Sequence, residues 1–347
     1  MKEKKIIKGL FIALSIVLLA SVASLFAIMA SNAKKKTKVV FRDSEATAEQ
    51  SDEICNVLFL GTDREAGLCD VVMLVNVNFS DETATVAQIP RDTYARYTES
   101  SYKKLNGAYK ALGGAKQTAE FLADAFCIDI HHYICIDLDT LSDVVDAVGG
   151  VDVDLPFDMK YRDPEQGLYI DLREGMTHLD GELAEQFVRF RSGYADGDLG
   201  RIDAQKLFMA AFFEKIANEF SPVMAARLTA AADGVETDIK ISDILAIGAR
   251  VIDMEANSIS MMTLAGAEAI ASKSGASYFV LSAASCTEIM ERYFGGSGEF
   301  DPNKLFLNEN YDEFEEIYEG YSEYSVTPMK GLLSYEQTKN RGKSFKR

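Results

Sequence analysis

The chain has 347 residues, 48% of them hydrophobic, and a formal net charge of −18. This length suffices for one large hydrophobic core or two small ones. So acidic a balance disfavours nucleic-acid readers, which need a basic surface to bind phosphates. We therefore expect no nucleic-acid partner.

Positive charge is concentrated at the N-terminus. Residues 1–42 contain nine Lys or Arg and one acid, Glu3, and carry +8, whereas the remainder carries −26. An uncharged apolar run over residues 9–33 lies between two groups of lysines and is long enough to span a bilayer. We expect residues 1–8 to form a short cytoplasmic tail and residues 9–33 to form a transmembrane signal anchor.

A cleaved signal peptide is the alternative, because Ser31-Asn32-Ala33 resembles a small-residue cleavage site. Equal lysine numbers on the two flanks leave the orientation open by the positive-inside rule. The short N-terminal tail favours a single-pass protein of the cell membrane, with its N-terminus inside and its large domain outside. Residues 34–53 are predicted to be a linker.

Strands and helices alternate after the linker. Strands are predicted at 56–60, 71–77, 83–89, 133–138, 151–155, 258–264 and 278–281, and the second and third form a hairpin. Helices are predicted at 104–112, 115–126, 141–148 and 284–294. Further helices are predicted from an Asp180 N-cap to Val188, from Asp198 to about Phe220, and from Ser221-Pro222 onward. The pattern predicts one α/β domain over 54–295, with a central mixed sheet flanked by helices, and a flexible tail over 296–347, acidic and then basic.

Five cysteines match no metal-binding spacing. Cys55 and Cys69 bracket one loop, and Cys127 and Cys135 are also near in sequence, so either pair is a candidate disulfide. The favoured reading is that most of them are small buried apolar groups.

Arginines gather in two short stretches of this acidic chain. One contains Arg91, which follows a predicted strand; the other contains Arg189, Arg191 and Arg201, with Gln205 one helical turn later. If the helix from Asp180 ends near Val188, Arg189 and Arg191 lie on the same side of an extended segment. Glycines at 193, 197 and 200 allow the following loop to fold back, and Asp198 would cap the next helix. Because arginine suits phosphate oxygens, the pattern predicts a polyanion pocket, the alternative being a solvated helix end with surface salt bridges.

Two carboxylates stand near other strand ends. Asp63 follows the first predicted strand and Asp70 precedes the second. Each alone is typical of a turn. Together, facing an arginine pocket, they suit Mg2+ when waters and phosphate oxygens supply the remaining ligands.

These motifs, in this order, resemble the LytR-CpsA-Psr (LCP) family. The matching segments are Asn56-Val57-Leu58-Phe59-Leu60-Gly61-Thr62-Asp63, Asp70-Val71-Val72-Met73-Leu74, Ile89-Pro90-Arg91-Asp92-Thr93-Tyr94, Lys104-Leu105-Asn106-Gly107-Ala108-Tyr109, Val145-Asp146-Ala147-Val148-Gly149-Gly150-Val151, Leu179-Asp180-Gly181-Glu182, Val188-Arg189-Phe190-Arg191 and Asp198-Leu199-Gly200-Arg201. The resemblance covers most of residues 54–295. It implies an extracytoplasmic LCP catalytic domain there.

The resemblance implies a Gram-positive cell-envelope enzyme. Such enzymes move a glycopolymer (teichoic acid, capsule or similar) from a polyprenyl-diphosphate carrier to peptidoglycan and release polyprenyl phosphate. By motif position, Asp63 and Asp70 would hold Mg2+, or Mn2+ in its place. The diphosphate-binding residues would be Arg91, Arg189, Arg191, Arg201 and Gln205, and the catalytic residues would be Asp63, Asp70, Arg91, Arg189 and Arg191. The prenyl chain would lie in an apolar tunnel between sheet and helices.

One departure leaves the activity open. Many family members carry an arginine where this chain has Leu68, two residues before Asp70. The alternatives are therefore a non-catalytic polyprenyl-phosphate-binding sensor or attenuator of envelope biogenesis, or a polyprenyl-diphosphate pyrophosphatase.

Overall fold

A computed structural model describes most of the predicted domain. The described residues are 54–63, 66–97, 103–164, 168–194, 198–240, 257–296, 304–305, 314–317 and 326–332, with Ile247, Val251 and Met254. The predicted anchor (9–33) and linker (34–53) lie outside them. Among the helices of the described residues, none has both the length and the apolar character needed to cross a membrane.

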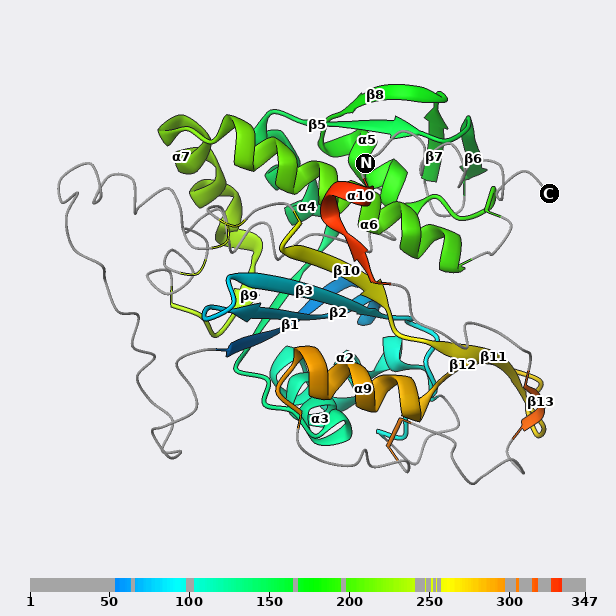
Figure 1. The fold of residues 1–347 in the computed structure, drawn as a ribbon. Coiled ribbons are helices and arrows are strands. Elements are labelled where there is room, and N and C mark those ends of the chain that lie inside the picture. Colours follow the sequence, from blue (N-terminus) through cyan, green and yellow to red (C-terminus); the bar gives the residue numbers. More distant parts are fainter. Residues whose placement is uncertain are drawn as a thin grey trace.

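A seven-stranded sheet forms the centre of the described domain, in the order β14-β10-β3-β2-β1-β4-β9 (Figure 1). The strands are β1 (Ile54–Asp63), β2 (Leu68–Asn78), β3 (Thr83–Ile89), β4 (His132–Ile136), β9 (Glu236–Thr237), β10 (Ile259–Thr263) and β14 (Thr327–Pro328). β1, β2 and β3 pair antiparallel as neighbours, whereas β4 is parallel to β1 and β10 is parallel to β3. The predicted mixed sheet and its hairpin are confirmed.

Apolar side chains of the sheet belong to two separate cores. In β1, Val57 and Phe59 join the core on one face, whereas Leu58 and Leu60 join the core on the other. Successive residues of a strand point to opposite faces, so a strand covered on both sides is apolar throughout. All four side chains are at most 3% exposed. The continuous apolar run of β1 therefore marks a strand buried on both faces.

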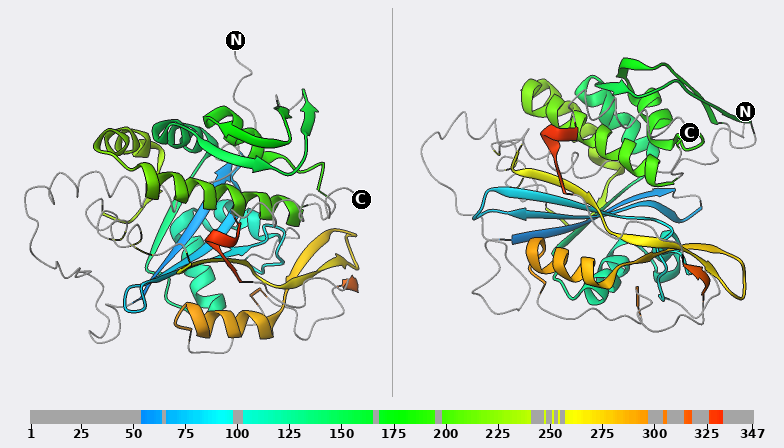
Figure 2. Two further views of the ribbon diagram at one scale, coloured as in Figure 1. Left: turned by 45° about the horizontal axis from the view of Figure 1, so that its top comes forward. Right: turned by 45° about the vertical axis from the view of Figure 1, so that its right-hand side comes forward.

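Helices cover both faces and give three layers, which the views of Figure 2 show from two further directions. One face carries α4 (Leu138–Val148), α5 (Gly181–Arg189), α6 (Asp198–Glu219), α7 (Pro222–Ala231) and α10 (Met329–Leu332). The other carries η1 (Leu105–Gly107), α2 (Ala108–Leu112), α3 (Ala115–Phe126) and α9 (Ala283–Tyr293). We call the core beneath α4–α7 the first core and the opposite one the second core. The predicted caps at Asp180 and Ser221 are confirmed, because each side chain accepts a hydrogen bond from the backbone three residues later.

Smaller sheets flank this arrangement. β5 (Val151–Leu155) pairs with β8 (Gly175–Leu179), β6 (Met159–Asp163) pairs with β7 (Leu168–Leu172), and β11 (Gly266–Ala271) pairs with β12 (Ser277–Leu281) and β13 (Phe314–Ile317). The sequence predicted β5 and most of β12, but not β6, β7, β8 or β11. The 3-10 turn η2 (Ala232–Gly234) links α7 to β9.

The packed structure continues beyond residue 295, where the sequence predicted the end of the domain. β14 pairs with the edge strand β10, and α10 places Met329 and Leu332 in the first core. Their exposed fractions are only 5% and 1%. Part of the region predicted as a flexible tail, 296–347, therefore belongs to the folded domain.

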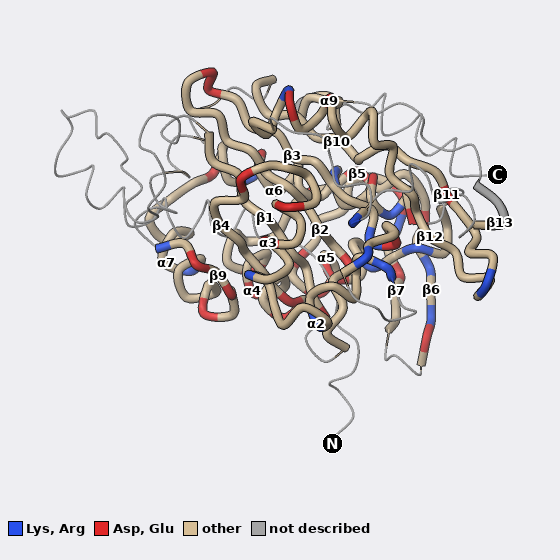
Figure 3. Tube along the Cα trace, turned by 90° about the horizontal axis from the view of Figure 1, so that it is seen from below, with Lys and Arg blue, Asp and Glu red and all other residues tan. Residues whose placement is uncertain are grey.

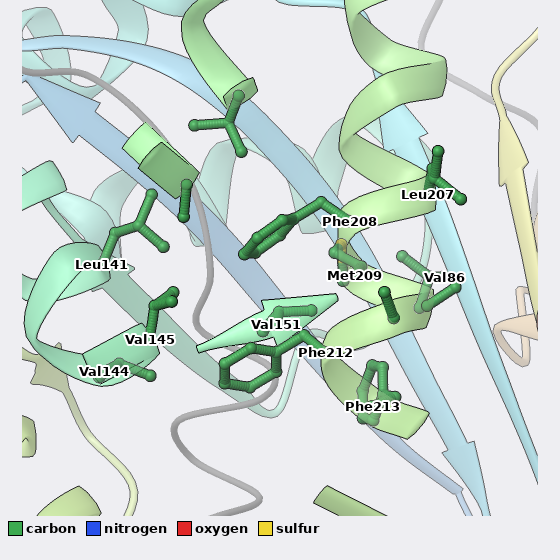
Figure 4. Packing of buried hydrophobic residues seen from close by; sticks show 14 of the residues in the cluster. Val86, Leu141, Val144, Val145, Val151, Leu207, Phe208, Met209, Phe212 and Phe213 are labelled. Carbon is green, nitrogen blue, oxygen red and sulfur yellow. The ribbon is translucent and has the colours of Figure 1, made fainter. Parts of the chain in front are cut away.

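Phe208 and Phe212 fix α6 over the sheet (Figure 4). Both are fully buried, and they extend from α6 across β5 toward α4, whose Leu141 and Val145 point back at them. Burying a side chain of this size contributes about 2–3 kcal/mol. This packing also fixes the position of the first turn of α6, where charged residues gather.

All five cysteines are free, four of them buried and Cys127 partly exposed. Neither candidate disulfide, Cys55–Cys69 or Cys127–Cys135, is formed. Burial raises the pKa of Cys55 to about 12, so this thiol stays protonated and acts as a small apolar group.

Candidate functional site

The strand ends that carry the predicted site residues lie at one end of the central sheet. β1 ends at Asp63, and β3 ends two residues before Arg91. β2 is antiparallel to both strands, so its beginning, with Asp70, lies at the same end. The first turn of α6 reaches this end too, because Asp198 contacts Arg91. The fold thus brings together residues that are far apart in the sequence.

Asp70 occupies a β-bulge. The β1–β2 register shifts between Gly61 and Thr62, so that Asp70 has no residue opposite it on β1. An extra residue of this kind bends its strand and re-aims a side chain. Here the bulge brings the carboxylate to the guanidinium of Arg91.

Arg91 is held between two carboxylates. Its Nη1 donates a hydrogen bond to Asp70, and its Nη2 lies 3.3 Å from Oδ1 of Asp198. Burial alone would lower the pKa of Arg91, but the charges of Asp70 and Asp198 more than offset burial and raise it above its ordinary value. Arg91 is therefore a permanently charged group in a partly buried position.

Asp198 also joins Arg91 to Arg201. Nη2 of Arg201 lies 2.9 Å from Oδ1 and 3.2 Å from Oδ2 of Asp198, three residues earlier on α6. Burial lowers the pKa of Arg201; Asp198 opposes this effect, and the positive charge of Arg91 adds to it. The sequence predicted Asp198 as a helix cap. In the structure it is the first residue of α6, and two arginines share its carboxylate.

Asp70, Arg91, Asp198 and Arg201 form what we call the charged cluster. Within the described part of the chain, Nε of Arg91 and Nε of Arg201 are buried and have no hydrogen-bond acceptor. A buried donor without a partner costs about 1–3 kcal/mol. An anion with several oxygens would supply the acceptors that these two donors lack.

The predicted alignment of Arg189 with Arg191 on an extended segment is wrong. α5 ends at Arg189, and the backbone becomes extended only at Phe190. Nη1 of Arg189 lies 2.8 Å from Oε1 of Glu185, one helical turn earlier. Arg191 is exposed, and its charge adds to the burial that lowers the pKa of Arg201. The structure thus pairs Arg189 along its own helix and leaves Arg191 exposed on the turn after α5.

Formal charges nearly balance in this region. In the charged cluster two arginines face two carboxylates, and Glu185 balances Arg189. Figure 3 shows basic and acidic segments gathered together near α5, β7 and β12. Arg191 adds an exposed positive charge. The cluster therefore binds an anion chiefly when the oxygens of that anion replace a carboxylate as partners of the arginines, or when a cation binds the carboxylates instead.

Gln205 makes hydrogen bonds within the fold. Its side chain is fully buried, its Oε1 accepts a hydrogen bond from Gln88 at 2.9 Å, and its Nε2 donates to the carbonyl of Val188 at 3.2 Å. These bonds tie α6 to β3 and α5. The predicted contact between Gln205 and a diphosphate would require these bonds to break.

An aromatic group supports the turn after α5. The ring centroids of Phe157, Phe190 and Tyr194 lie 5.5 to 6.0 Å apart. A Cβ at Gly193 would lie 2.8 Å from the Phe190 ring, and one at Gly200 would lie 2.4 Å from Cβ of Tyr194. Only glycine permits these approaches, which agrees with the prediction that glycines let the loop fold back. No sequence motif singled out Tyr194.

The two predicted metal ligands lie on adjacent strands. Asp63 is 7% exposed, and its Oδ1 accepts a hydrogen bond from the amide of Ala66 at 3.0 Å. Within the described residues there is no group of three or more His, Cys, Asp or Glu that could hold a metal. Carboxylate oxygens fit a hard cation such as Mg2+, but Asp63 and Asp70 alone leave most ligand positions to waters and phosphate oxygens.

Known proteins resemble this chain over most of the described domain. A Bacillus subtilis protein named polyisoprenyl-teichoic acid–peptidoglycan teichoic acid transferase TagV is 30% identical over 234 residues, covering 65% of this chain and 60% of that protein. An Enterococcus faecalis transferase with the same description, TagU, is 30% identical over 257 residues, covering 70% of this chain and 82% of that protein. The crystal structure of Bacillus subtilis TagV matches with a TM-score of 0.60 at 28% identity, covering 69% of this chain and 95% of that one. The chain thus spans less than two thirds of the full length of TagV.

The family model described as LytR_cpsA_psr matches residues 19–294. This range is most of the chain and contains the whole charged cluster. The resemblance drawn from the sequence motifs is confirmed: the chain belongs to the LytR_cpsA_psr family.

Proposed function

We propose that this chain is a phosphotransferase that attaches a glycopolymer to peptidoglycan. The donor is a teichoic acid, capsular polymer or similar chain carried on polyprenyl diphosphate. Family membership and the names of the relatives support this proposal. The observation that carries it is the pair of buried arginines with unpartnered Nε donors, because they mark an anion site in a strongly acidic chain.

The reaction forms one phosphodiester bond and breaks one diphosphate bond. A peptidoglycan hydroxyl oxygen attacks the phosphorus that bears the glycopolymer. The bond from this phosphorus to the bridging oxygen breaks, and polyprenyl phosphate leaves with the bridging oxygen. The hydroxyl proton passes to a base.

Arg91, Arg191 and Arg201 bind the diphosphate. Their forks match phosphate oxygens, and their charges stabilise the negative charge that develops on the leaving group. Arg189 joins them when a phosphate oxygen replaces Glu185 as its partner. Gln205 does not bind the diphosphate but holds α5 and α6 in place. Each arginine thus contributes mainly by position and charge.

Asp63 is the candidate for the base, since it stands at the end of β1, next to the start of β2. A base must lie within hydrogen-bond reach of the attacking hydroxyl. Asp63 lies at the same end of the sheet, at the last position of β1.

Asp63 and Asp70 hold Mg2+, or Mn2+ in its place. The cation would supply positive charge beside the diphosphate. A cation bound to Asp70 would leave Asp198 as the carboxylate partner of Arg91. Part of the Arg91 guanidinium would then be available to bind phosphate. This coupling predicts that Mg2+ raises the melting temperature of the wild type when pyrophosphate is present, and raises it less in Asp70→Asn.

The hydrocarbon chain of the carrier enters the first core, between the sheet and α4–α7. That layer contains α5 and α6; Asp198 and Arg201 lie on α6, and Arg191 lies two residues after the end of α5. The anchor predicted at 9–33 keeps the domain at the outer face of the cell membrane, where a lipid-borne donor lies.

Two alternatives keep the same site. One is a non-catalytic sensor or attenuator that binds polyprenyl phosphate, and the other is a pyrophosphatase that uses water as the acceptor. The balanced charge of the charged cluster and the leucine at position 68 motivate both. Release of polyprenyl phosphate excludes the sensor, and glycan attached to peptidoglycan excludes a pure pyrophosphatase.

The test is ligation in vitro of a polyprenyl-diphosphate glycan to peptidoglycan. Removing Arg91 or Arg201 should lower the rate by at least about a hundredfold, the scale of losing one group that stabilises transition-state charge. Arg227→Ala is the matched control, since this exposed arginine lies on α7, outside the charged cluster. Unchanged rates in Arg91→Ala and Arg201→Ala would overturn the proposal.

A further inference from the structure

An open pocket of about 520 Å³ lies beside the turn that carries Arg191. It is lined by Phe157, Asp158, Lys160, Glu174, Phe190, Ser192 and Gly193. Phe190, Ser192 and Gly193 flank Arg191 in sequence, and Tyr194 of the same turn lies against Gly200, next to Arg201 on α6. The pocket therefore adjoins the charged cluster without belonging to it.

A strip of side chains on the β6–β7 hairpin continues from this pocket. Lys160 lines the pocket, and its Nζ lies 4.0 Å from Oδ1 of Asp171 across the hairpin. The two residues are paired in register. Two residues along each strand, the guanidinium of Arg162 lies 5.2 Å above the ring of Tyr169, with which it is also paired. Side chains two residues apart share a face and lie about 7 Å apart along the strand. The strip thus presents a charged pair and then an aromatic ring.

The ring of Tyr169 is unusually open. Tyr169 is 51% exposed, and it is among the few large hydrophobic side chains of the described residues that are exposed at all. Tyr161 of the same hairpin is 40% exposed but points to the opposite face, because it precedes Arg162 in the strand. The hairpin therefore offers one aromatic ring on the pocket side and a comparable one on the other side.

This chemistry suits a sugar chain. Sugar rings stack their apolar C–H faces on aromatic rings, and their hydroxyls bond to carboxylates and ammonium groups. Asp158 and Glu174 of the lining are matched by Lys160 and by Arg173, whose Nη1 lies 3.7 Å from Oδ2 of Asp158. Such a lining offers both hydrogen-bond donors and acceptors to the hydroxyls of a glycan.

We propose that the pocket and the Lys160–Tyr169 strip bind the glycan strand of the acceptor. The inference rests on the proposed transfer reaction, to which it adds the location of the acceptor. A strand lying along the strip would enter the pocket next to Arg191, so that one of its hydroxyls faces the bound diphosphate. The donor and acceptor would then approach the charged cluster from different sides.

The test compares Tyr169→Ala with Tyr161→Ala in the full chain. Two quantities are measured: the affinity for soluble, uncrosslinked peptidoglycan strands without donor, and the KM values for donor and acceptor during transfer. Tyr169→Ala should weaken strand binding and raise the acceptor KM about tenfold, the effect of losing one stacked ring. Glu174→Gln should act in the same direction, whereas Tyr161→Ala and the donor KM should stay unchanged.

The outcomes separate this inference from the proposed function. If the wild type transfers polymer but Tyr169→Ala and Glu174→Gln leave strand binding unchanged, the acceptor site is overturned and the transferase stands. If these variants raise the donor KM instead, the pocket serves the donor and the inference is overturned. If the wild type binds strands through Tyr169 but shows no transfer activity, the glycan site stands and the proposed transferase function is overturned.

Discussion

Asp198 shows how a single residue acquires a role that its sequence position does not reveal. An aspartate before a helix is expected to cap it. In the structure its carboxylate is shared by Arg91 and Arg201 and keeps two buried like charges together. Burial and the positive charge of Arg91 lower the pKa of Arg201, and Asp198 is the main charge that opposes them. Without Asp198, this pKa would fall further.

We therefore predict that Asp198→Asn destabilises the fold by about 1–3 kcal/mol, because Arg91 and Arg201 lose their shared anion. Asparagine has almost the same shape, so the loss reports charge rather than packing. Inorganic pyrophosphate should restore most of the stability by taking the place of the carboxylate. Urea denaturation with and without pyrophosphate measures both effects.

Asp203→Asn is the matched control for this prediction. Asp203 lies on the same helix but pairs with a single cation, Lys206, at 2.7 Å. Its loss should be smaller and should not respond to pyrophosphate. Equal losses and equal responses in the two variants would contradict the bridging role of Asp198.

The sequence located most members of the site but not their pairing. Arg91 and Asp70 were predictable as site residues because each stands at the end of an apolar strand. Their contact depends on a bulge between Gly61 and Thr62, which follows from strand register and leaves no local mark in the sequence. The pairing of Arg189 with Glu185 was readable, since residues four apart share a helix face.

At the scale of elements, burial decided which strands the sequence revealed. β1, β2 and β3 are apolar over most of their length because helices cover both of their faces. β6 was missed because Lys160, Tyr161 and Arg162 are exposed and carry no apolar alternation. β14 has two residues and is defined only by its pairing with β10, which no local pattern encodes.

The C-terminal segment is predicted to stabilise the whole domain. A chain ending after residue 325 would lose β14 and α10, exposing the β10 edge and removing Met329 and Leu332 from the first core. Each buried apolar side chain contributes about 2 kcal/mol, so the loss should be about 4 kcal/mol or more. The midpoint of urea denaturation measures it.

A chain ending after residue 332 is the control and should keep nearly the full stability. Leu332→Ala in the complete chain tests the same contact if the shorter chain does not fold, and should cost about 2–4 kcal/mol. Equal stability of the chains that end at 325 and 332 would show that the segment adds nothing to the fold.

At the scale of the molecule, the sheet divides the domain into two chemically different halves. The first core lies under α5 and α6, and the first turn of α6 carries Asp198 and Arg201; Leu199 of the same turn packs against the second core. The sequence predicted a central sheet with helices, yet not which helices share a face, because that depends on strand order. We propose that a lipid whose phosphate binds the charged cluster places its chain in the first core, beneath α5 and α6.

Two leucine substitutions test this division. Leu141 of the first core and Leu122 of the second are both fully buried, so alanine at either position should cost about 2–5 kcal/mol and leave an apolar cavity. A prenyl monophosphate such as geranyl phosphate should recover much of that stability in Leu141→Ala, since hydrocarbon can occupy an apolar cavity. It should recover little in Leu122→Ala, because Leu122 lies on α3, on the opposite face of the sheet from α5 and α6. Thermal unfolding with geranyl phosphate, and with inorganic phosphate as the headgroup control, measures the difference; equal recovery in both variants would contradict a lipid site confined to the first core.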